Sequence, residues 1–390
     1  MNLNDIYEKA AAGKRISVEE GIELLTHGDL IRIGKIADEI RLRKHPEKQV
    51  SIVIDRNINY SNICNVYCTF CAFYRPPKGK RSEQEGYVLT HQQIAEKLDE
   101  LMAAGGTQIL IQGGVHPDLK IEFYEDMFSF IKSNYPSVWI HGLSAVEVSY
   151  IAKVSGLSLD ETIKRLKVSG LDSMPGAGAE ILHEEIRQRI SPLKITIPEW
   201  IEVHETFHRN DMRTSATMMF GVEEEPYHLI GHLEELRQLQ DRTAGFTAFI
   251  PWIFQESDGA PLRVKHHATA HEYLKLLAVS RIYLDNFDNV QISFVTMGSK
   301  IGQVALRFGA NDFGSFMMEE NVVRAAGAEN LMALREMCRL IREAGFTPVQ
   351  RTMDYRILRE FTDDEIAQPS AYQGNTSQQN PKLRVLNSVI

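Results

Sequence analysis

The sequence predicts an α/β fold, a (β/α)8 TIM-type barrel with N-terminal helices before it and a C-terminal helical extension after it. Short apolar runs alternate with helical patterns, eight such runs occur, and Gly-rich or chemically unusual residues follow most of them. Eight strands, each followed by a helix, is the count of such a barrel. A doubly wound open sheet shows the same alternation and stays open as an alternative.

The elements follow one another in a regular order. Residues 1–48 are expected to be helical, since Ile6 and Ala10 recur at helical spacing and Ser17 can cap a second helix. The barrel is assigned to 49–320, the helical extension to 321–367 and a polar tail to 368–390. Apolar runs predict strands at Val50–Ile54, Gln108–Gln112, Val138–His141, Leu171–Met174, Thr214–Phe220, Phe246–Phe254, Val290–Val295 and Ala310–Phe313. Helices are expected at Thr90–Ala104, Ile121–Asn134, Leu157–Val168, Ala179–Arg189, Pro198–Arg209, Pro226–Asp241, Ala268–Asp285, Lys300–Phe308 and Leu331–Ala344.

The composition limits the choice of partner and compartment. The 390 residues carry a formal net charge of −9, which argues against nucleic acid or an anionic membrane as a partner. No run of about 18 apolar residues predicts a transmembrane helix, and the polar N-terminus lacks the apolar core of a signal peptide. The sequence therefore indicates a cytoplasmic protein.

Three of the four cysteines form a C-x3-C-x2-C pattern after the first strand, at Cys64, Cys68 and Cys71. Thiolates are the ligands that iron–sulfur clusters require, and three of them would leave one iron of a [4Fe–4S] cluster open to a small molecule. A zinc site would need a fourth ligand, such as His116 or His141 approaching in space. An electron carrier of the bacterial ferredoxin type would need a fourth cysteine nearby, whereas Cys338 lies far away in a late helix and suits a buried core position.

The cysteine pattern, with an aromatic residue before the last cysteine, resembles the radical S-adenosylmethionine (SAM) superfamily. Within it the chain is most similar to the dehypoxanthine futalosine cyclases of the futalosine route to menaquinone. The likeness runs from Arg56 to Arg356 and includes RNINYSNICNVYCTFCAFYR, ILIQGGVHPDL, GLDSMPGAGAEIL, TSATMMFGVEE, GFTAFIPWIFQ and LRFGANDFGS. Aminofutalosine synthase and a deazaflavin (FO) synthase subunit share much of this text and remain alternatives; IPWIFQ and NDFGS favour the cyclase.

The resemblance implies a [4Fe–4S] cluster and SAM as cofactors. It also implies a small-molecule substrate and an electron donor such as flavodoxin or ferredoxin. The implied reaction begins when a 5′-deoxyadenosyl radical abstracts the ribose C4′ hydrogen, and it ends in a cyclised product. By the same resemblance, residues on the strand-end loops would hold SAM: Phe70 and Ile250 against the adenine, Gly113 and Gly114 at the ammonium, Glu180 at the ribose, Arg187 at the carboxylate and Glu224 near the adenine.

Substrate-binding and proton-transfer residues are harder to choose. A benzoate carboxylate favours an arginine fork, and Arg56, at the end of the first strand, is better placed than Arg281. We expect His141 and Trp252 to contribute to the substrate pocket. The titratable candidates for the base are His116, His141, Asp285 and Asp312, of which His116, Asp285 and Asp312 are assigned as catalytic.

Overall fold

The computed structural model describes residues 2–315, 318–319, 321–326, 330 and 332–362. Its strands are β1 Gln49–Val53, β2 Asp55–Asn59, β3 Gln108–Gln112, β4 Trp139–Gly142, β5 Ser173–Met174, β6 Arg213–Phe220, β7 Phe246–Ile253, β8 Asn289–Val290, β9 Asp312–Ser315, β10 Thr347–Arg351 and β11 Ile357–Glu360. Its helices are α1 Leu3–Ala11, α2 Val18–His27, α3 Leu30–Lys44, α4 Lys80–Glu85, α5 His91–Ala103, α6 Ile121–Asn134, α7 Ala145–Ser155, α8 Leu159–Ser169, α9 Glu184–Ile190, α10 Ile197–Arg209, α11 Pro226–Thr243, α12 Ala270–Tyr283, α13 Phe294–Ala305, α14 Val322–Ala325 and α15 Leu334–Glu343. The expected tail at 368–390 lies outside the described residues.

The strands form a closed ring. Strands β2 to β8 make one sheet in sequence order, and β9 pairs in parallel with β1, which runs almost directly into β2. Between β8 and β9 the ring closes where Gln291 pairs with Asp312. Two backbone bonds complete this closure, from the N–H of Asn311 to the carbonyl of Val290 (3.1 Å) and from the N–H of Ile292 to the carbonyl of Asp312 (3.0 Å). The predicted barrel is therefore confirmed, and the open-sheet alternative is wrong.

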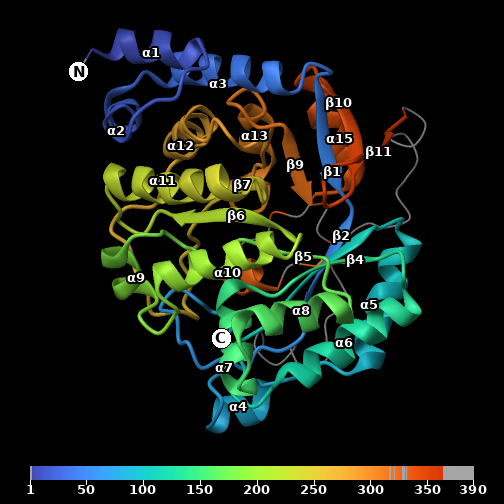
Figure 1. The fold of residues 1–390 in the computed structure, drawn as a ribbon. Coiled ribbons are helices and arrows are strands. Elements are labelled where there is room, and N and C mark those ends of the chain that lie inside the picture. The colour runs from blue at the N-terminus through green and yellow to red at the C-terminus, as the bar shows by residue number, and fades with distance from the viewer. Residues whose placement is uncertain (1, 316–317, 320, 327–329, 331, 363–390) are drawn as a thin grey trace, which may run out of the picture.

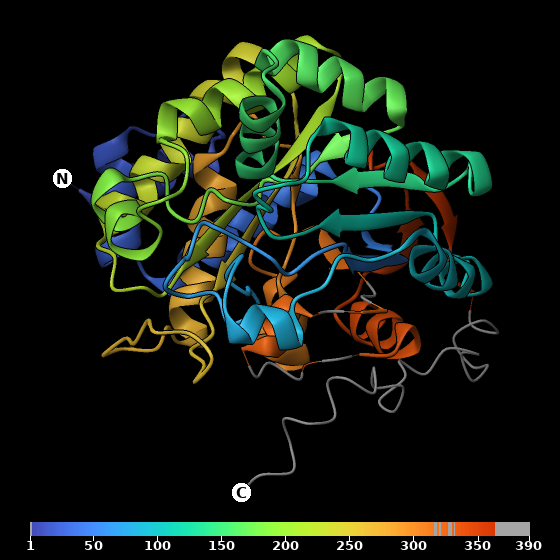
Figure 2. The same cartoon turned by 90° about the horizontal axis from the view of Figure 1, so that it is seen from below.

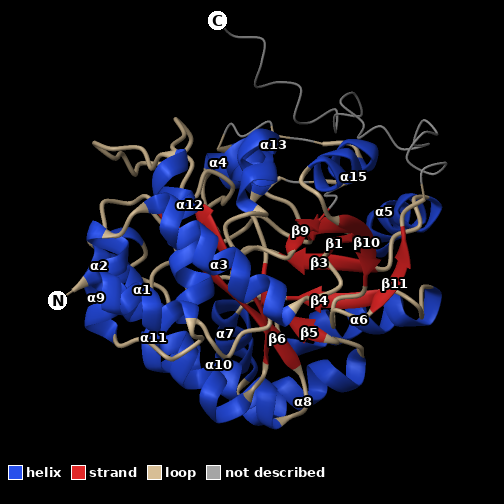
Figure 3. Cartoon of the chain, turned by 90° about the horizontal axis from the view of Figure 1, so that it is seen from above, coloured by secondary structure: helices blue, strands red, loops and turns tan. Residues whose placement is uncertain are grey.

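Helices enclose the ring of strands, as the view from above shows (Figure 3). At one end lie the N-terminal helices, where α3 contacts α12 and α2 contacts α11 (Figure 1). The expected N-terminal helical segment is thus present as α1 to α3. Across the described ranges, no helix combines the length and apolar character needed to cross a membrane.

The first strand and the C-terminal extension depart from the expected pattern. Strand one extends past the predicted Val50–Ile54 into β2, and its first half, β1, pairs with β10 on one side and β9 on the other. Strand β10 also pairs with β11 in antiparallel orientation. The extension that was expected to be helical therefore also contributes two strands, which lengthen the sheet beside β1.

Helix starts follow capping chemistry that is visible in the sequence. Helices α2, α5, α10 and α12 each begin with a capping box, in which the N-cap hydroxyl accepts from the third residue and that residue's side chain accepts from the N-cap backbone. The third residues are Glu20, Gln93, Glu199 and Glu272, and all of them are exposed or half-buried. Capping alone thus leaves these polar side chains in contact with water.

A buried ion pair lies inside the ring and ties β10 to β9. Arg351, at the end of β10, is 1% exposed and donates to the carboxylate of Asp312, which is 0% exposed. Ser51 on β1 also donates to Asp312 (2.8 Å), so the carboxylate joins three strands. A charged pair with no access to water is stable only when both partners stay together.

Replacing Arg351 with alanine should leave the Asp312 carboxylate buried without its counter-charge, and should lower the free energy of unfolding by about 3 kcal/mol or more. Urea unfolding of the apoprotein, followed by circular dichroism, measures this loss. Arg339→Ala on α15 is the matched control, because Arg339 is 48% exposed and forms surface ion pairs. Equal losses in the two variants would contradict a structural role for the buried pair.

Candidate active site

The three clustered cysteines lie on the loop between β2 and α4, at the carboxyl end of the first strand. The N–H of Cys64 donates to the carbonyl of Arg75 (2.9 Å), and the N–H of Arg75 donates to the carbonyl of Asn62 (2.7 Å), which closes the loop at its base. Cys68 is buried, whereas Cys64 and Cys71 are half-buried. Helix α4, which follows this loop, faces the viewer when the molecule is seen from below (Figure 2).

The donor set on this loop fits an iron–sulfur cluster better than a single metal ion. In the described part of the chain, the only group of three potential ligand atoms within 4.8 Å of one another contains none of these cysteines. Three sulfurs that stand apart suit three separate irons of one cluster. The N–H of Val66 donates to Cys64 Sγ (3.5 Å), and hydrogen bonds to the sulfurs help to set the reduction potential of an iron–sulfur cluster. Without metal, burial raises the pKa of the Cys68 thiol to about 12.

The Gly113–Gly114 segment, which follows β3, lies directly against the cysteine loop. A Cβ at Gly114 would lie 2.2 Å from the carbonyl oxygen of Ile63 and 2.9 Å from Cys64 Cβ. At Gly113 a Cβ would lie 2.6 Å from the ring of Tyr60. The approach of these two loops therefore requires glycine at both positions.

Glu180 lies close to the cysteine loop, with Lys194 and Phe70 beside it. Glu180 is buried, adopts a left-handed backbone conformation (φ 48°) and forms an ion pair with Lys194. The Lys194 ammonium lies 5.1 Å from the centre of the Phe70 ring. Burial opposes a charge on Lys194, but the nearby Cys68 and Glu180 outweigh it and raise its pKa. Lys194 was missed in the sequence because a lysine between predicted helices usually lies on the surface.

Arg187 and Glu224 make local contacts. The Arg187 guanidinium donates to the carbonyls of Gly178 (2.9 Å), Ala179 (2.9 Å) and Ile195 (2.5 Å), so it holds the loop that carries Glu180. Burial lowers the pKa of Arg187. Glu224 accepts from the N–H groups of Gly221 (2.8 Å) and Val222 (2.7 Å), which shapes the turn after β6. These local contacts account for the positions of both side chains without the SAM contacts that the sequence led us to expect.

Ile250 and Trp252 lie two residues apart on β7 and are both half-buried, whereas Pro251 between them is buried. Strand residues two apart share one face of a sheet. Their strand partners on β6 are Thr217 and Met219. The half-exposed face of β7 is thus apolar at the carboxyl half of the strand, where the cysteine loop also lies.

Two expected site residues lie elsewhere. Arg56 projects toward α5 on the outside of the ring, where it pairs with Glu100 (2.5 Å) and Glu319 (2.8 Å). Asp285 follows α12, at the end of the barrel where strands begin, and pairs with Arg15 (3.0 Å). Side chains alternate between the two faces of a strand, and a single sequence does not reveal whether Arg56 faces into or out of the ring. The expectations that Arg56 binds the substrate and that Asp285 is catalytic are therefore corrected.

The other titratable candidates also have structural partners. His116 accepts the N–H of Asp118 at Nδ1 (3.1 Å), so its neutral ring carries the proton on Nε2 and is a donor there. The Asp312 carboxylate accepts a hydrogen bond from Arg351 inside the ring. His141 is buried beside Ser173 (Nδ1 to Oγ, 2.7 Å), and burial lowers its pKa to about 3. Each of the three side chains is thus held by a structural partner.

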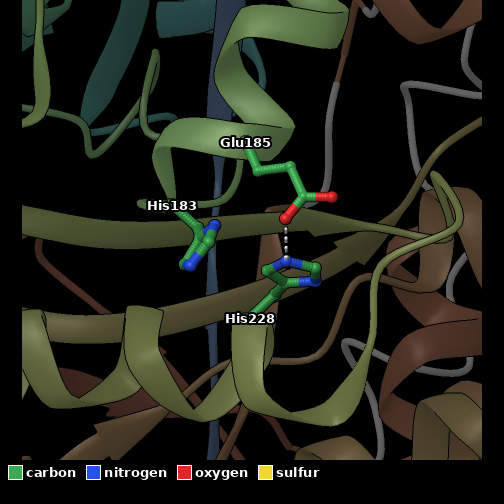
Figure 4. Close-up of side chains that lie close together, drawn as sticks. All are labelled: His183, Glu185 and His228. Carbon is green, nitrogen blue, oxygen red and sulfur yellow. Dashed lines mark hydrogen bonds and ion pairs between the residues drawn. The ribbon is translucent and has the colours of Figure 1, made fainter.

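A second group of potential ligands consists of His183, Glu185 and His228 (Figure 4). His228 Nε2 lies 3.3 Å from Glu185 Oε2. His228 Nδ1 accepts the N–H of Glu225 (2.9 Å) at the start of α11, which places the ring proton on Nε2. With that proton in place, Nε2 has no lone pair with which to bind a metal. The position of His228 is explained by its bond at the start of α11 and by the hydrogen bond that its Nε2–H donates to Glu185.

Comparison with family models gives two matches that together cover most of the chain. Residues 58–236 match the model of the radical SAM superfamily. Residues 243–364 match a model described as the CofH/MqnC C-terminal region.

Relatives of known name match along almost their whole length. The chain is 45% identical to cyclic dehypoxanthine futalosine synthase of Halalkalibacterium halodurans, over 94% of this chain and 98% of that protein. It is 37% identical to 5-amino-6-(D-ribitylamino)uracil–L-tyrosine 4-hydroxyphenyl transferase of Methanopyrus kandleri, over 93% and 98%. Among solved structures, the FeFe-hydrogenase maturase HydG from Carboxydothermus hydrogenoformans superposes with a TM-score of 0.72 at 16% identity, over 91% of this chain and 80% of that one. This last likeness concerns the fold alone.

Alanine at any one of Cys64, Cys68 or Cys71 should prevent stable assembly of the cluster and abolish SAM cleavage, because each sulfur would hold one iron. Iron analysis after anaerobic reconstitution measures assembly. Cys338→Ala is the control: this residue is buried in α15, so the variant should retain the cluster at a modest cost in stability. A requirement for Cys338 in cluster assembly would contradict the assignment of the three ligands.

Glu180→Gln should keep the cluster and weaken SAM binding by on the order of tenfold, because the carboxylate and its partner Lys194 lie next to the cysteine loop. Isothermal titration of SAM into the reconstituted protein measures the affinity. Glu184→Gln, an exposed change a few residues away, serves as the control. Unchanged affinity and unchanged 5′-deoxyadenosine production in Glu180→Gln would return Glu180 to a purely structural role.

Proposed function

The chain belongs to the radical SAM superfamily, and from this premise we propose that it converts dehypoxanthine futalosine to cyclic dehypoxanthine futalosine in menaquinone biosynthesis. The observation that carries the proposal is 45% identity to a named cyclic dehypoxanthine futalosine synthase over 94% of the chain. A second synthase of that name, from Streptomyces coelicolor, is 40% identical over 99% of the chain. Similarity on this scale includes both the barrel and the C-terminal region.

Within this proposal, Cys64, Cys68 and Cys71 would hold a [4Fe–4S] cluster that leaves one iron for SAM. When bound, the cluster and SAM would supply a 5′-deoxyadenosyl radical for abstraction of the ribose C4′ hydrogen. The electron would come from a carrier such as flavodoxin or ferredoxin. Two half-buried cysteines and a loop that ends at the exposed Lys78 and Lys80 are compatible with an electron donor approaching from this side.

SAM would lie over the two glycines that touch the cysteine loop. The carbonyl groups of Gly113 and Gly114 would accept from its ammonium group, and Glu180 with Lys194 would contact its polar ribose and carboxylate. Phe70 and Ile250 offer apolar surface for the adenine. Phe70, the two glycines, Glu180 and Lys194 lie on loops between elements, and Ile250 lies within β7.

The substrate would enter the ring from the same rim. Trp252 on β7, with Gln112 on β3 and Gln291 after β8, is half-buried at the carboxyl half of the barrel. His141 lies deeper in the ring and is neutral at pH 7, because burial lowers its pKa to about 3. These side chains offer an apolar wall and neutral hydrogen-bonding groups, which suit a substrate with an aromatic ring and a ribose. The barrel walls would exclude water from the reacting carbon.

A second candidate function is the transfer reaction named for the Methanopyrus kandleri relative. It is favoured by 37% identity over 93% of the chain. Product analysis separates the two reactions, since one joins atoms within a single substrate and the other joins two molecules.

Dehypoxanthine futalosine that carries deuterium at C4′ should transfer the label to 5′-deoxyadenosine, because positioning alone selects which C–H bond the radical attacks. Mass spectrometry after anaerobic turnover detects both the label and a product that has lost two hydrogens relative to the substrate. The same substrate deuterated elsewhere on the ribose is the control. A cyclised product together with unlabelled deoxyadenosine would show that the radical abstracts a hydrogen from another position. No turnover of this substrate would contradict the proposed reaction.

A further inference from the structure

A buried carboxyl group connects three strand ends beside the Gly113–Gly114 segment. Glu147, in the first turn of α7, is 3% exposed. Its Oε1 accepts from the N–H of Gly113 (3.0 Å) and from the hydroxyl of Tyr60 (2.8 Å), and its Oε2 accepts from the hydroxyl of Ser144 (2.6 Å). Tyr60 follows β2, Gly113 follows β3 and Ser144 follows β4. One side chain therefore links three neighbouring loops of the rim.

Helix capping does not account for this carboxyl group. Ser144 is the N-cap of α7 and Glu147 is the third residue, which is the spacing of a capping box. In the capping boxes of α2, α5, α10 and α12 the third side chain turns back to the N-cap backbone and stays exposed or half-buried. The Glu147 side chain instead accepts from Gly113 and Tyr60, which follow β3 and β2, and it is buried.

Burying a carboxyl group is costly unless donors replace the lost water. Burial raises the pKa of Glu147 to about 7, although the hydrogen bonds from Ser144, Tyr60 and Gly113 oppose the shift. A neutral side chain of similar size would avoid this cost. The buried carboxyl group is thus present despite its cost in free energy, and it lies where the N–H of Gly113 needs an acceptor.

The bond from Gly113 fixes the orientation of the loop. A peptide group is planar and joins the carbonyl of one residue to the N–H of the next. Holding the N–H of Gly113 therefore sets the direction of the Gln112 carbonyl, and holding the N–H of Gly114 sets the direction of the Gly113 carbonyl. Glu147 holds the N–H of Gly113, and the carbonyl of Ser61 holds the N–H of Gly114 (2.8 Å). Within the described residues, neither a backbone N–H nor a side chain donates to the carbonyls of these two glycines. Glu147 thus fixes the peptide group that enters the glycine segment, and the carbonyl of Ser61 fixes the next one, which carries the Gly113 carbonyl.

We propose that Glu147 is a positioning residue, which anchors the Gly113–Gly114 segment so that its carbonyls face the ammonium group of SAM. The inference rests on the proposed SAM site, and it adds a residue that acts through the loop without touching the ligand. The acceptor oxygen matters more than the charge, because the bond to Gly113 requires only an acceptor of the correct reach.

Glu147→Ala removes the acceptor and should raise the dissociation constant for SAM on the order of tenfold or more. Glu147→Gln keeps an acceptor oxygen at the same distance and should stay within about threefold of the original protein. Val148→Ala is the control, because Val148 is equally buried in α7 and makes no contact of this kind, so it should lower stability without changing SAM affinity. Titration of SAM into reconstituted protein of matched iron content measures all three.

Each outcome decides between roles. SAM affinity in Glu147→Ala equal to that of the original protein would overturn the inference, and so would equal losses in Glu147→Gln and Glu147→Ala. A loss in Val148→Ala as large as that in Glu147→Ala would assign the effect to general destabilisation. If Glu147→Ala does not fold, Glu147→Asp replaces it: the shorter carboxylate cannot reach Gly113 and should weaken binding. Failure of the original protein to bind SAM would instead overturn the proposed function.

Discussion

Closure of the strand ring is the constraint on which the rest of the structure depends. The carboxyl ends of eight parallel strands meet at one rim only if the last strand pairs with both the first and the seventh. Asn311 makes that junction, since its side chain accepts from the N–H of Val290 (2.9 Å) and from Arg281 (2.6 Å), and its backbone bonds to β8. Asp312 next to it holds Arg351 and Ser51. The NDFGS segment, which resembles a family signature, thus closes the barrel in this chain.

Once the ring is closed, the rim brings loops that are distant in sequence into contact. The cysteine loop touches the glycines after β3, and Glu180 with Lys194 approaches from the chain after β5. The valines that pack with Cys68 come from the cysteine loop, the loop after β3 and the first turn of α7. Glycine is needed where two backbones come within van der Waals distance, and a buried carboxyl is needed where a loop has a free N–H. The chemistry of the site therefore follows from how closely strand-end loops can approach one another.

Much of this could be predicted from one sequence, for identifiable reasons. Apolar runs with turn residues between them gave the strands, and β3 and α6 have the predicted bounds. Strand β10 escaped notice because its run TPVQR contains a proline and polar residues, and it is stabilised by pairing with β1 and by Arg351. Arg56 was misplaced because periodicity does not say which face of a strand turns inward. Lys194 and Glu147 have the local sequence of surface residues, and only tertiary contacts bury them.

The claim that three cysteines leave one iron open to SAM is tested most directly by electron paramagnetic resonance of the reduced, reconstituted protein with and without SAM. The spectrum of the cluster should change when SAM is added, because the ligand coordinates the iron that lacks a cysteine. A spectrum that is unaffected by saturating SAM would contradict the claim, and would indicate a fully ligated cluster that only carries electrons.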